Sequence, residues 1–249
     1  MLVEYEGTRY YGFQVQKGVP TIQGELEGAV CKVTGERVRV KGAGRTDTGV
    51  HARGQVAAFE CSFKWSSEAL LRALNFYLPG DISVKDVCET EARFDPRRSA
   101  VSREYRYTIL NSPARSPILS RWTVLVKGQL DTEAMARASE ALIGEHDFAP
   151  FTNREGSTKG TVRRVLKSGV RRRGKLIFVD IEANAFLPQQ VRRVVGSLVR
   201  VGSGQMGVEE FCEVAASGEV GKARFVAPAR GLCLMKVNYS EIGFSYENI

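Results

Sequence analysis

Histidine and closely spaced cysteine are scarce in this chain, and their scarcity excludes several kinds of site. Only two histidines occur among 249 residues, His51 and His146, and neither belongs to an HExxH pattern. The five cysteines are never closer than 21 positions, so no CxxC pair exists. Zinc ribbons and dithiol redox motifs are therefore excluded. We expect five reduced, mostly buried thiols and no metal.

Long apolar runs are also missing. No run approaches the ~18 residues that a membrane-spanning helix needs, and the first seven residues lack the pattern of a signal peptide. These absences predict a soluble, cytoplasmic protein without a membrane partner. Hydrophobic residues make up 43% and charged residues 26% of the chain, values that exclude disorder, collagen and coiled coil.

Positive charge is in excess. Lys and Arg number 36 and Asp and Glu 28, which gives a formal net charge of +8. Such a balance favours an anionic partner, either a nucleic acid or an anionic metabolite. Charge alone does not choose between the two.

Caps and apolar spacing predict two helices in the first half, one from Thr21 to Gly35 and one beginning at Ser66. The strands expected around them are Leu2–Glu6, Arg37–Lys41, Gln55–Cys61 and Ile82–Cys88. The resulting order is βαββαβ.

The second half repeats this order. A strand at Ser102–Leu110 precedes a helix capped by Asp131, and Pro188 suits the first turn of a later helix. Other expected elements are a hairpin of Thr161–Val170 and Lys175–Ala183 that turns at Arg171–Gly174, a short helix at Val208–Ala216 and a last strand at Leu232–Tyr239.

Two such halves in series predict an α+β protein built from two ferredoxin-like units. Each unit is expected to have an antiparallel sheet with helices on one face, and a catalytic cleft is expected between the halves. The predicted domains are residues 1–97, which carry a glycine-rich loop, and residues 98–249, which carry the basic hairpin.

The glycine-rich loop lies between two predicted strands. Gly44 and Gly49 have the GxxxxG spacing of a phosphate loop, but Val50 and His51 stand where Lys and Ser or Thr belong. Asp47 has the wrong charge for a phosphate cradle. We therefore interpret the loop as presenting Asp47, a nucleophile or base kept ionised by the nearby Arg45. The alternative is an Asx-turn with no chemical role.

Three further segments offer candidates for ligand binding. Tyr105 shares one strand face with Arg103 and Tyr107, a combination that stacks bases or borders a half-buried strand. Gln190 and Arg192 lie in the first turns of a helix, where a cation gains nothing from the macrodipole, so Arg192 either pairs with an interior carboxylate or is exposed to solvent.

The third segment is the basic hairpin. It holds seven positive residues in the thirteen positions 163–175, among them Arg171, Arg172 and Arg173, and no acidic residue. Such a run contacts phosphates or forms a plain solvated turn.

These motifs occur together in one known family. The chain carries the runs Tyr5–Gln14, Gly44–Ala52, Leu78–Ile82, Arg103–Tyr107, Gly144–Phe148 and Asn184–Gly196 in this order. In these runs it resembles the TruA family of tRNA pseudouridine synthases nearly end to end.

The resemblance implies a homodimer that isomerises uridine to pseudouridine at positions 38, 39 and 40 in the anticodon arm of tRNA, without a cofactor. It implies that Asp47 is the nucleophile, that Arg45 belongs to its loop, that Tyr105 packs against the target base and that Arg192 pairs with Asp47. We add Arg45, Gln190 and Arg171–Arg173 as expected substrate contacts.

Two other classes of function stay open at this point. A non-catalytic tRNA-binding module or chaperone on the same scaffold would bind tRNA whatever residue stands at position 47. An enzyme of a small anionic metabolite would not be inhibited by tRNA.

Overall fold

The computed structural model describes residues 1–249 except 63, 154–159, 241–243 and 245–249. The chain forms two compact units: unit 1 comprises residues 1–101 and 233–249, and unit 2 comprises residues 102–232. The sequence placed the last strand in the C-terminal half. In the structure it belongs to unit 1, because Cys233 and Leu234 pair with His51 and Ala52 in a parallel ladder.

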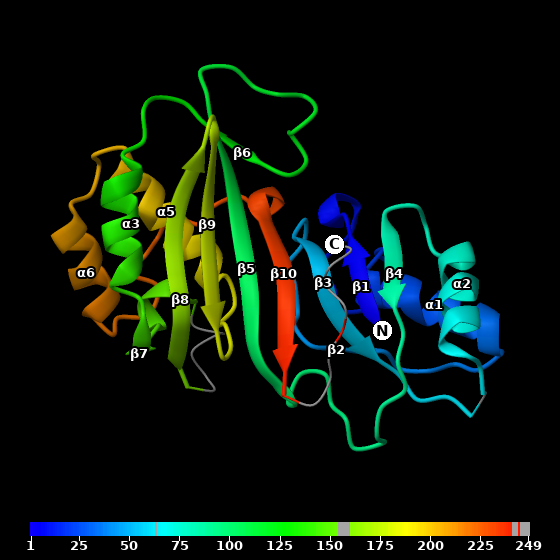
Figure 1. The fold of residues 1–249 in the computed structure, drawn as a ribbon. Helices are drawn as coiled ribbons and strands as arrows, with labels where there is room; N and C mark the ends of the chain where they lie inside the picture. Colours follow the sequence, from blue (N-terminus) through cyan, green and yellow to red (C-terminus); the bar gives the residue numbers. More distant parts are fainter. Residues whose placement is uncertain (63, 154–159, 241–243, 245–249) are drawn as a thin grey trace. The chain divides into compact units, whose positions relative to one another are not determined.

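Unit 1 has the predicted βαββαβ order (Figure 1). Its elements are β1 (Leu2–Tyr5), a 3₁₀ turn η1 (Gly7–Arg9), α1 (Ile22–Thr34), β2 (Lys41–Gly42), β3 (His51–Ala58), α2 (Ser67–Tyr77), β4 (Ile82–Asp86) and the added β10 (Leu232–Tyr239). The strands lie in the order β4-β1-β3-β10, with β2 paired to β3. Among the described ladders of this unit, the β3–β10 pair is parallel and the others are antiparallel.

The two helices of unit 1 begin where the sequence predicts, and α1 also ends at the predicted Gly35. The Thr21 hydroxyl accepts a hydrogen bond from the backbone N–H of Gly24, and Gly35 ends α1 in the left-handed region with φ 76°. The Ser66 hydroxyl caps α2 in the same way. Buried residues at Ile22, Leu26 and neighbouring positions of α1 form its core-facing stripe.

Two strands of unit 1 begin four residues away from their predicted starts. The strand expected at 37–41 is reduced to β2, and β3 begins at His51 rather than at residue 55. The earlier start follows from pairing with β1, because Tyr5 lies opposite Ala52 and Leu2 opposite Val56. The glycine-rich loop is therefore shorter than the sequence indicates.

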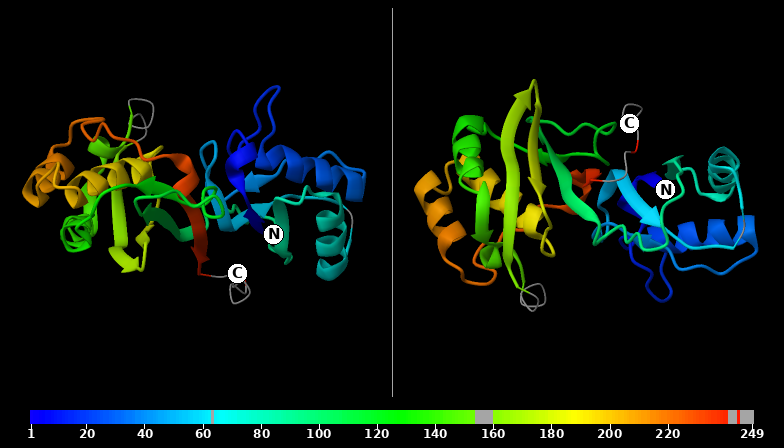
Figure 2. Two further views of the ribbon diagram at one scale, coloured as in Figure 1. Left: turned by 90° about the horizontal axis from the view of Figure 1, so that it is seen from above. Right: turned by 60° about the horizontal axis from the view of Figure 1, so that its bottom comes forward.

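The described residues of unit 2 form five strands and three α-helices. Its elements are β5 (Ala100–Asn111), β6 (Val124–Val126), α3 (Thr132–Glu140), β7 (Gly144–Asp147), η2 (Ala149–Phe151), β8 (Val162–Arg173), β9 (Leu176–Ala183), α5 (Gln190–Gly202), α6 (Val208–Ala216) and η3 (Ala229–Gly231). The order β5-β9-β8-β7 is antiparallel, and β6 adds to β5 in parallel. Helices α3 and α6 lie on one side of the β8–β9 hairpin (Figure 2).

The two faces of β5 have different environments, as the alternation in its sequence predicts. Arg103, Tyr105 and Tyr107 are each less than a tenth exposed, whereas Glu104 and Arg106 on the opposite face are half-buried. In the helix that follows the hairpin, Val191, Val194, Val195 and Leu198 are all buried.

Two predictions for unit 2 were wrong. Arg171–Arg173 continue strand β8 up to the pair Arg173–Leu176, so the turn consists of Gly174 and Lys175, and Gly174 supplies the required positive φ of 59°. Helix α5 begins at Gln190, so Pro188 lies outside its first turn. The short strands β6 and β7 were not predicted.

The structure bears on the expectations for the cysteines and for membrane-spanning helices. None of the five cysteines forms a disulfide, but they are not mostly buried, since four are half-buried and Cys88 is exposed. No helix in the described part of the chain has both the length and the apolar content of a membrane span.

Candidate functional site

Asp47 lies in the loop of residues 43–50 between β2 and β3, which we call the Asp47 loop. Its side chain is half-buried, and that of Arg45 is exposed. The backbone N–H of Val50 donates to the Asp47 carbonyl at 3.1 Å, and Gly49 takes a positive φ of 77° that permits this tight turn. The loop therefore holds Asp47 at its surface with a fixed backbone.

The segment Tyr10–Phe13 braces this loop from one side. The N–H of Phe13 donates to the Thr46 carbonyl at 3.0 Å, and the N–H of Gly49 donates to the Tyr10 carbonyl at 3.3 Å. Gly12 has φ 86°, and a Cβ there would lie 2.7 Å from the Thr46 oxygen. Only glycine fits this approach, so the close packing fixes the residue that precedes Asp47.

Two buried side chains hold the loop from beneath. The Gln55 amide bonds to both backbone groups of Gly44, with its Oε1 3.2 Å from the N–H and its Nε2 2.8 Å from the carbonyl oxygen. The Tyr5 hydroxyl lies 2.8 Å from Thr46 Oγ1. Neither residue could be predicted from the sequence as a contact of this loop, because a glutamine and a tyrosine inside predicted strands carry no signal of such contacts.

His51 follows the loop and is buried. Its Nδ1 accepts a hydrogen bond from the N–H of Gly7 at 3.0 Å and lies 3.4 Å from Glu6 Oε1. A nitrogen that accepts from an N–H has no proton to donate to a carboxylate. We therefore assign a neutral ring to His51, and the contact with Glu6 becomes an ion pair only on protonation.

Unit 2 carries the other predicted site residues. Tyr105, on β5, is 9% exposed, and its ring meets Phe186 edge to face with centroids 5.1 Å apart. Gln190 is buried, and its Oε1 accepts a hydrogen bond from the N–H of Leu187 at 2.8 Å. Its role in substrate binding stays a prediction.

Arg192 is held by an extended segment, residues 223–228, which we call the strap. The Nε of Arg192 donates to the Ala227 carbonyl at 2.8 Å, and the Arg192 carbonyl accepts from the Ala227 N–H at 3.0 Å. This reciprocal pair fixes both the backbone and the guanidinium of Arg192. The strap therefore restrains Arg192 through hydrogen bonds, as segment Tyr10–Phe13 restrains the Asp47 loop.

The strap is anchored at several further points. The Tyr107 hydroxyl donates to the Pro228 carbonyl at 2.8 Å, and Arg200 covers the Phe225 ring at 4.1 Å. Burial raises the pKa of Tyr107, and the nearby Arg192 and Arg230 oppose that shift. Tyr107 therefore serves as a neutral hydrogen-bond donor.

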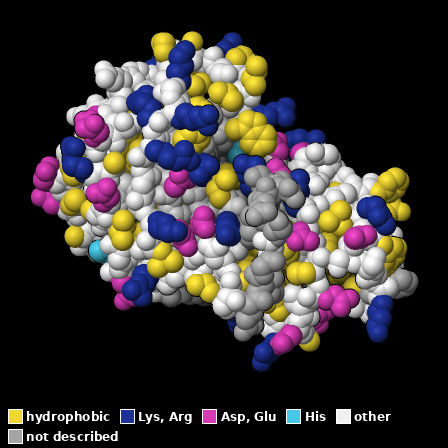
Figure 3. Space-filling view, viewed as in Figure 1, with side chains coloured by type: hydrophobic (Ala, Val, Ile, Leu, Met, Phe, Trp, Pro, Cys, Tyr) yellow, Lys and Arg dark blue, Asp and Glu magenta, His cyan; other side chains and the backbone are white. Residues whose placement is uncertain are grey.

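The arginines of the basic hairpin make more contacts within the protein than the sequence indicates. Arg171 Nε donates to Asp180 at 3.2 Å, and its guanidinium covers Phe178 at 4.5 Å. Arg172 donates to the carbonyl of Leu130 and to Asn111. Figure 3 shows acidic side chains interspersed among the basic ones on this face. The absence of acidic residues along β8 is thus compensated by Asp180 and Glu182 of the neighbouring β9.

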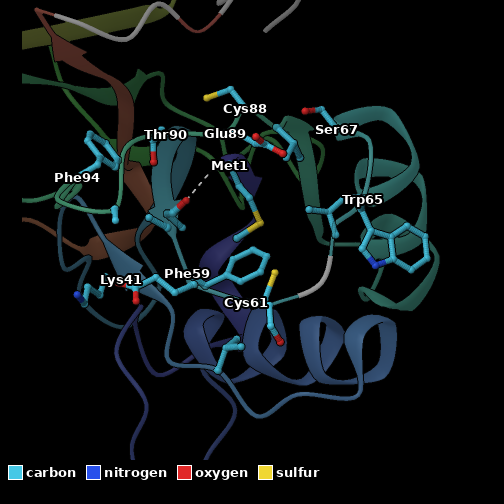
Figure 4. A pocket seen from close by; sticks show the side chains of 18 of the residues that line it. Met1, Lys41, Phe59, Cys61, Trp65, Ser67, Cys88, Glu89, Thr90 and Phe94 are labelled. Carbon is cyan, nitrogen blue, oxygen red and sulfur yellow. Dashed lines mark hydrogen bonds between the residues drawn. The ribbon is translucent and has the colours of Figure 1, made fainter.

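A cavity of about 770 Å³ opens in unit 1 and contains none of the predicted catalytic residues. Its wall includes Phe59, Cys61, Trp65 and Cys88 (Figure 4). The Met1 amino group at its edge donates to the Ala57 carbonyl at 2.8 Å. The volume of this cavity therefore does not identify the predicted catalytic site.

Comparison with known proteins agrees with the motifs that define this site. The profile of a family described as tRNA pseudouridine synthase matches residues 1–97 and 138–240. Proteins called tRNA pseudouridine synthase A are 42% identical in Citrifermentans bemidjiense, over 97% of both chains, and 44% identical in Roseiflexus castenholzii, over 97% of this chain and 90% of that one. A Thermoanaerobacter protein of the same name is 41% identical over 96% of this chain and 98% of its own. The chain belongs to the tRNA pseudouridine synthase family, the members of which are isomerases.

Proposed function

We propose that this protein converts uridine to pseudouridine at positions 38, 39 and 40 in the anticodon arm of tRNA, with Asp47 as the nucleophile. The observation that carries the proposal is the Asp47 loop, in which a half-buried carboxylate is presented on a backbone braced from two sides. The family match supplies the substrate class.

The reaction conserves atoms and electrons. The bond from N1 of uracil to C1′ of ribose breaks, the base turns, and C5 bonds to C1′, while the proton lost from C5 is balanced by one gained at N1. Because substrate and product are isomers, the reaction needs no oxidant, reductant or group donor. We therefore propose that it proceeds without a cofactor.

Each residue has a defined task in this proposal. The target nucleotide leaves its stack, at a cost of a few kcal/mol, and ionised Asp47 attacks C1′ or assists cleavage of the glycosidic bond. Tyr105 stacks on the detached uracil, a contact for which its edge-to-face neighbour Phe186 orients the ring. Arg192 pairs with Asp47, and the strap fixes its guanidinium.

We further propose that the protein acts as a homodimer, as the resemblance implies. Light scattering of the purified protein should give twice the mass of the chain. A mass equal to that of one chain at assay concentrations would overturn this part of the proposal.

Tritium release tests the chemistry. Unmodified tRNA labelled with tritium at C5 of uridine is incubated with wild type and with Asp47→Asn, which replaces the nucleophile with an isosteric amide. Wild type should release tritium, and Asp47→Asn should release none while binding tRNA with little change. Absence of release by both proteins, with tRNA still bound, would favour the non-catalytic binding module instead.

A further inference from the structure

Gln55 occupies a place in the structure from which it controls the Asp47 loop without meeting a substrate. It is fully buried at 0% exposure and lies opposite Val3 of β1 within the sheet of unit 1. We propose that Gln55, together with Tyr5, is a positioning residue that sets the geometry of the Asp47 loop for catalysis. This inference rests on the proposed function, because it takes Asp47 as the reacting group.

The Gln55 amide satisfies Gly44 in both directions. Its oxygen accepts from the Gly44 N–H and its nitrogen donates to the Gly44 carbonyl, as a paired strand would. Gly44 is thereby held in register although the Asp47 loop has left the sheet. A side chain that offers only donors or only acceptors cannot replace both bonds.

Tyr5 extends the hold to the residue next to Asp47. Its hydroxyl lies 2.8 Å from Thr46 Oγ1 and accepts a longer contact of 3.4 Å from Gln55 Nε2. Tyr5 and Thr46 are 2% and 6% exposed, so no bulk water replaces these bonds. Burial makes each of them costly to leave unmade, because an unsatisfied polar group in the interior has no other partner.

The backbone contacts complete the restraint. Thr46 is held through its carbonyl by Phe13 and through its hydroxyl by Tyr5, so the residue before Asp47 is fixed from two directions. A displacement of about 1 Å in a reacting group reduces turnover by as much as about 100-fold. The expected consequence of loosening Gln55 is therefore a loss of kcat without a matching loss of tRNA binding.

The test compares two buried glutamines of unit 1 that both hold backbone groups. Gln55→Met removes both bonds to Gly44 at nearly constant volume. Gln23→Met is the matched control, since Gln23 is 4% exposed and bonds to the backbone of Val15 and Val40, outside the Asp47 loop. Gln55→Met should lower kcat about 10- to 100-fold with the KM for tRNA within about twofold, whereas Gln23→Met should keep kcat within about twofold of wild type.

A conservative variant supplies a second readout. In Gln55→Glu, the protonated carboxyl can accept from the Gly44 N–H and donate to the Gly44 carbonyl, but the ionised form has no proton to donate. Burial raises the pKa of a carboxyl group. We therefore expect kcat of this variant to be rescued at low pH and to fall as pH rises through that pKa, relative to wild type. A role limited to folding would leave the pH profile of the folded enzyme unchanged.

Tyr5→Phe keeps the proposal testable if the glutamine variants do not fold. It removes one hydroxyl and should lower kcat about fivefold. Tyr239→Phe, which loses a hydroxyl bonded to the Pro96 carbonyl at 2.7 Å, should leave kcat unchanged.

Asp47→Asn, run in the same assay, separates the two levels of the argument. If Asp47→Asn is inactive while Gln55→Met and Tyr5→Phe retain wild-type kcat, or lose no more than their controls, the positioning role is refuted and the proposed function stands. If Asp47→Asn retains activity, both proposals are overturned.

Discussion

Gly196 of α5 lies under the strap, and its replacement tests whether the strap sets the position of Arg192. A Cβ at position 196 would lie 2.1 Å from the carbonyl oxygen of Phe225 and 2.8 Å from its carbonyl carbon. Both atoms are backbone, so no side-chain rotation relieves the contact. Gly196→Ala must therefore move the strap away from α5 by about 1 Å.

The cost follows from two opposing effects. Overpacking of a well-packed site costs about 1–3 kcal/mol, and a collision with backbone belongs to the upper end of that range. Alanine is about 1 kcal/mol more favourable than glycine inside a helix, and this gain offsets part of the cost. The net destabilisation is about 2 kcal/mol, which for a chain of this size lowers Tm by about 4–8 °C.

The loss of activity should exceed what the loss of stability alone would cause. The strap carries the Ala227 carbonyl that orients Arg192, so its displacement moves the guanidinium that we propose pairs with Asp47. A shift of about 1 Å predicts a kcat lowered by about 10- to 100-fold at a temperature where the variant is folded.

Gly28→Ala is the matched control. Gly28 lies inside α1, is exposed and has no atom within 4 Å of a built Cβ. The Gly28→Ala variant should be more stable than wild type by about 0.5–1 kcal/mol, with an unchanged kcat. Thermal unfolding and tritium release measure both variants. A Gly196→Ala protein with the Tm and kcat of wild type would refute the argument that the strap is tightly packed and positions Arg192.

Two further predictions concern charge. Arg172→Ala should lower stability by about 1 kcal/mol, since it loses bonds to Asn111 and Leu130. Arg173→Ala should reduce the slope of log Kd for tRNA against log salt by about one, and an unchanged slope for Arg173→Ala would contradict this. The free energy of unfolding should fall as pH rises above about 10. Tyrosines ionise there in the unfolded chain, whereas burial raises the pKa of Tyr107 in the folded protein. Tyr107→Phe should be less stable at neutral pH but should show a shallower alkaline decline, and an equally steep decline in its Tm would rule out Tyr107 as a source.

The helices of this fold could be predicted from the sequence because their ends are encoded locally. Thr21, Ser66 and Asp131 each cap a helix with a side-chain oxygen, and the bounds Val208–Ala216 of α6 agree with the prediction. Local hydrogen bonds and apolar spacing suffice for such elements.

Strand bounds and contacts depend on partners far along the chain. The start of β3 at His51 is set by its ladder with β1, and the β6 strand exists only through its pairing with β5. The position of the hairpin turn was wrong because Gly174 signals a turn without fixing which neighbours belong to it, and β9 supplies pairing partners for all three arginines. Register is a tertiary property, so it escapes a local analysis.

The candidate site divides in the same way. The glycine spacing around Asp47 and the alternation around Tyr105 are local patterns and were recognised. Gln55 and the strap were not, because their roles consist of bonds to Gly44 and Arg192 that the sequence separates by 11 and about 35 residues.

The most direct test of the central claim is the identity of the product. tRNA transcripts with uridine at only one of positions 38, 39 and 40 of the anticodon arm are incubated with wild type or Asp47→Asn, digested to nucleosides and separated by chromatography. We expect pseudouridine from wild type at each of the three positions and none from Asp47→Asn. Recovery of unchanged uridine from wild type, or of pseudouridine from both proteins, would contradict it.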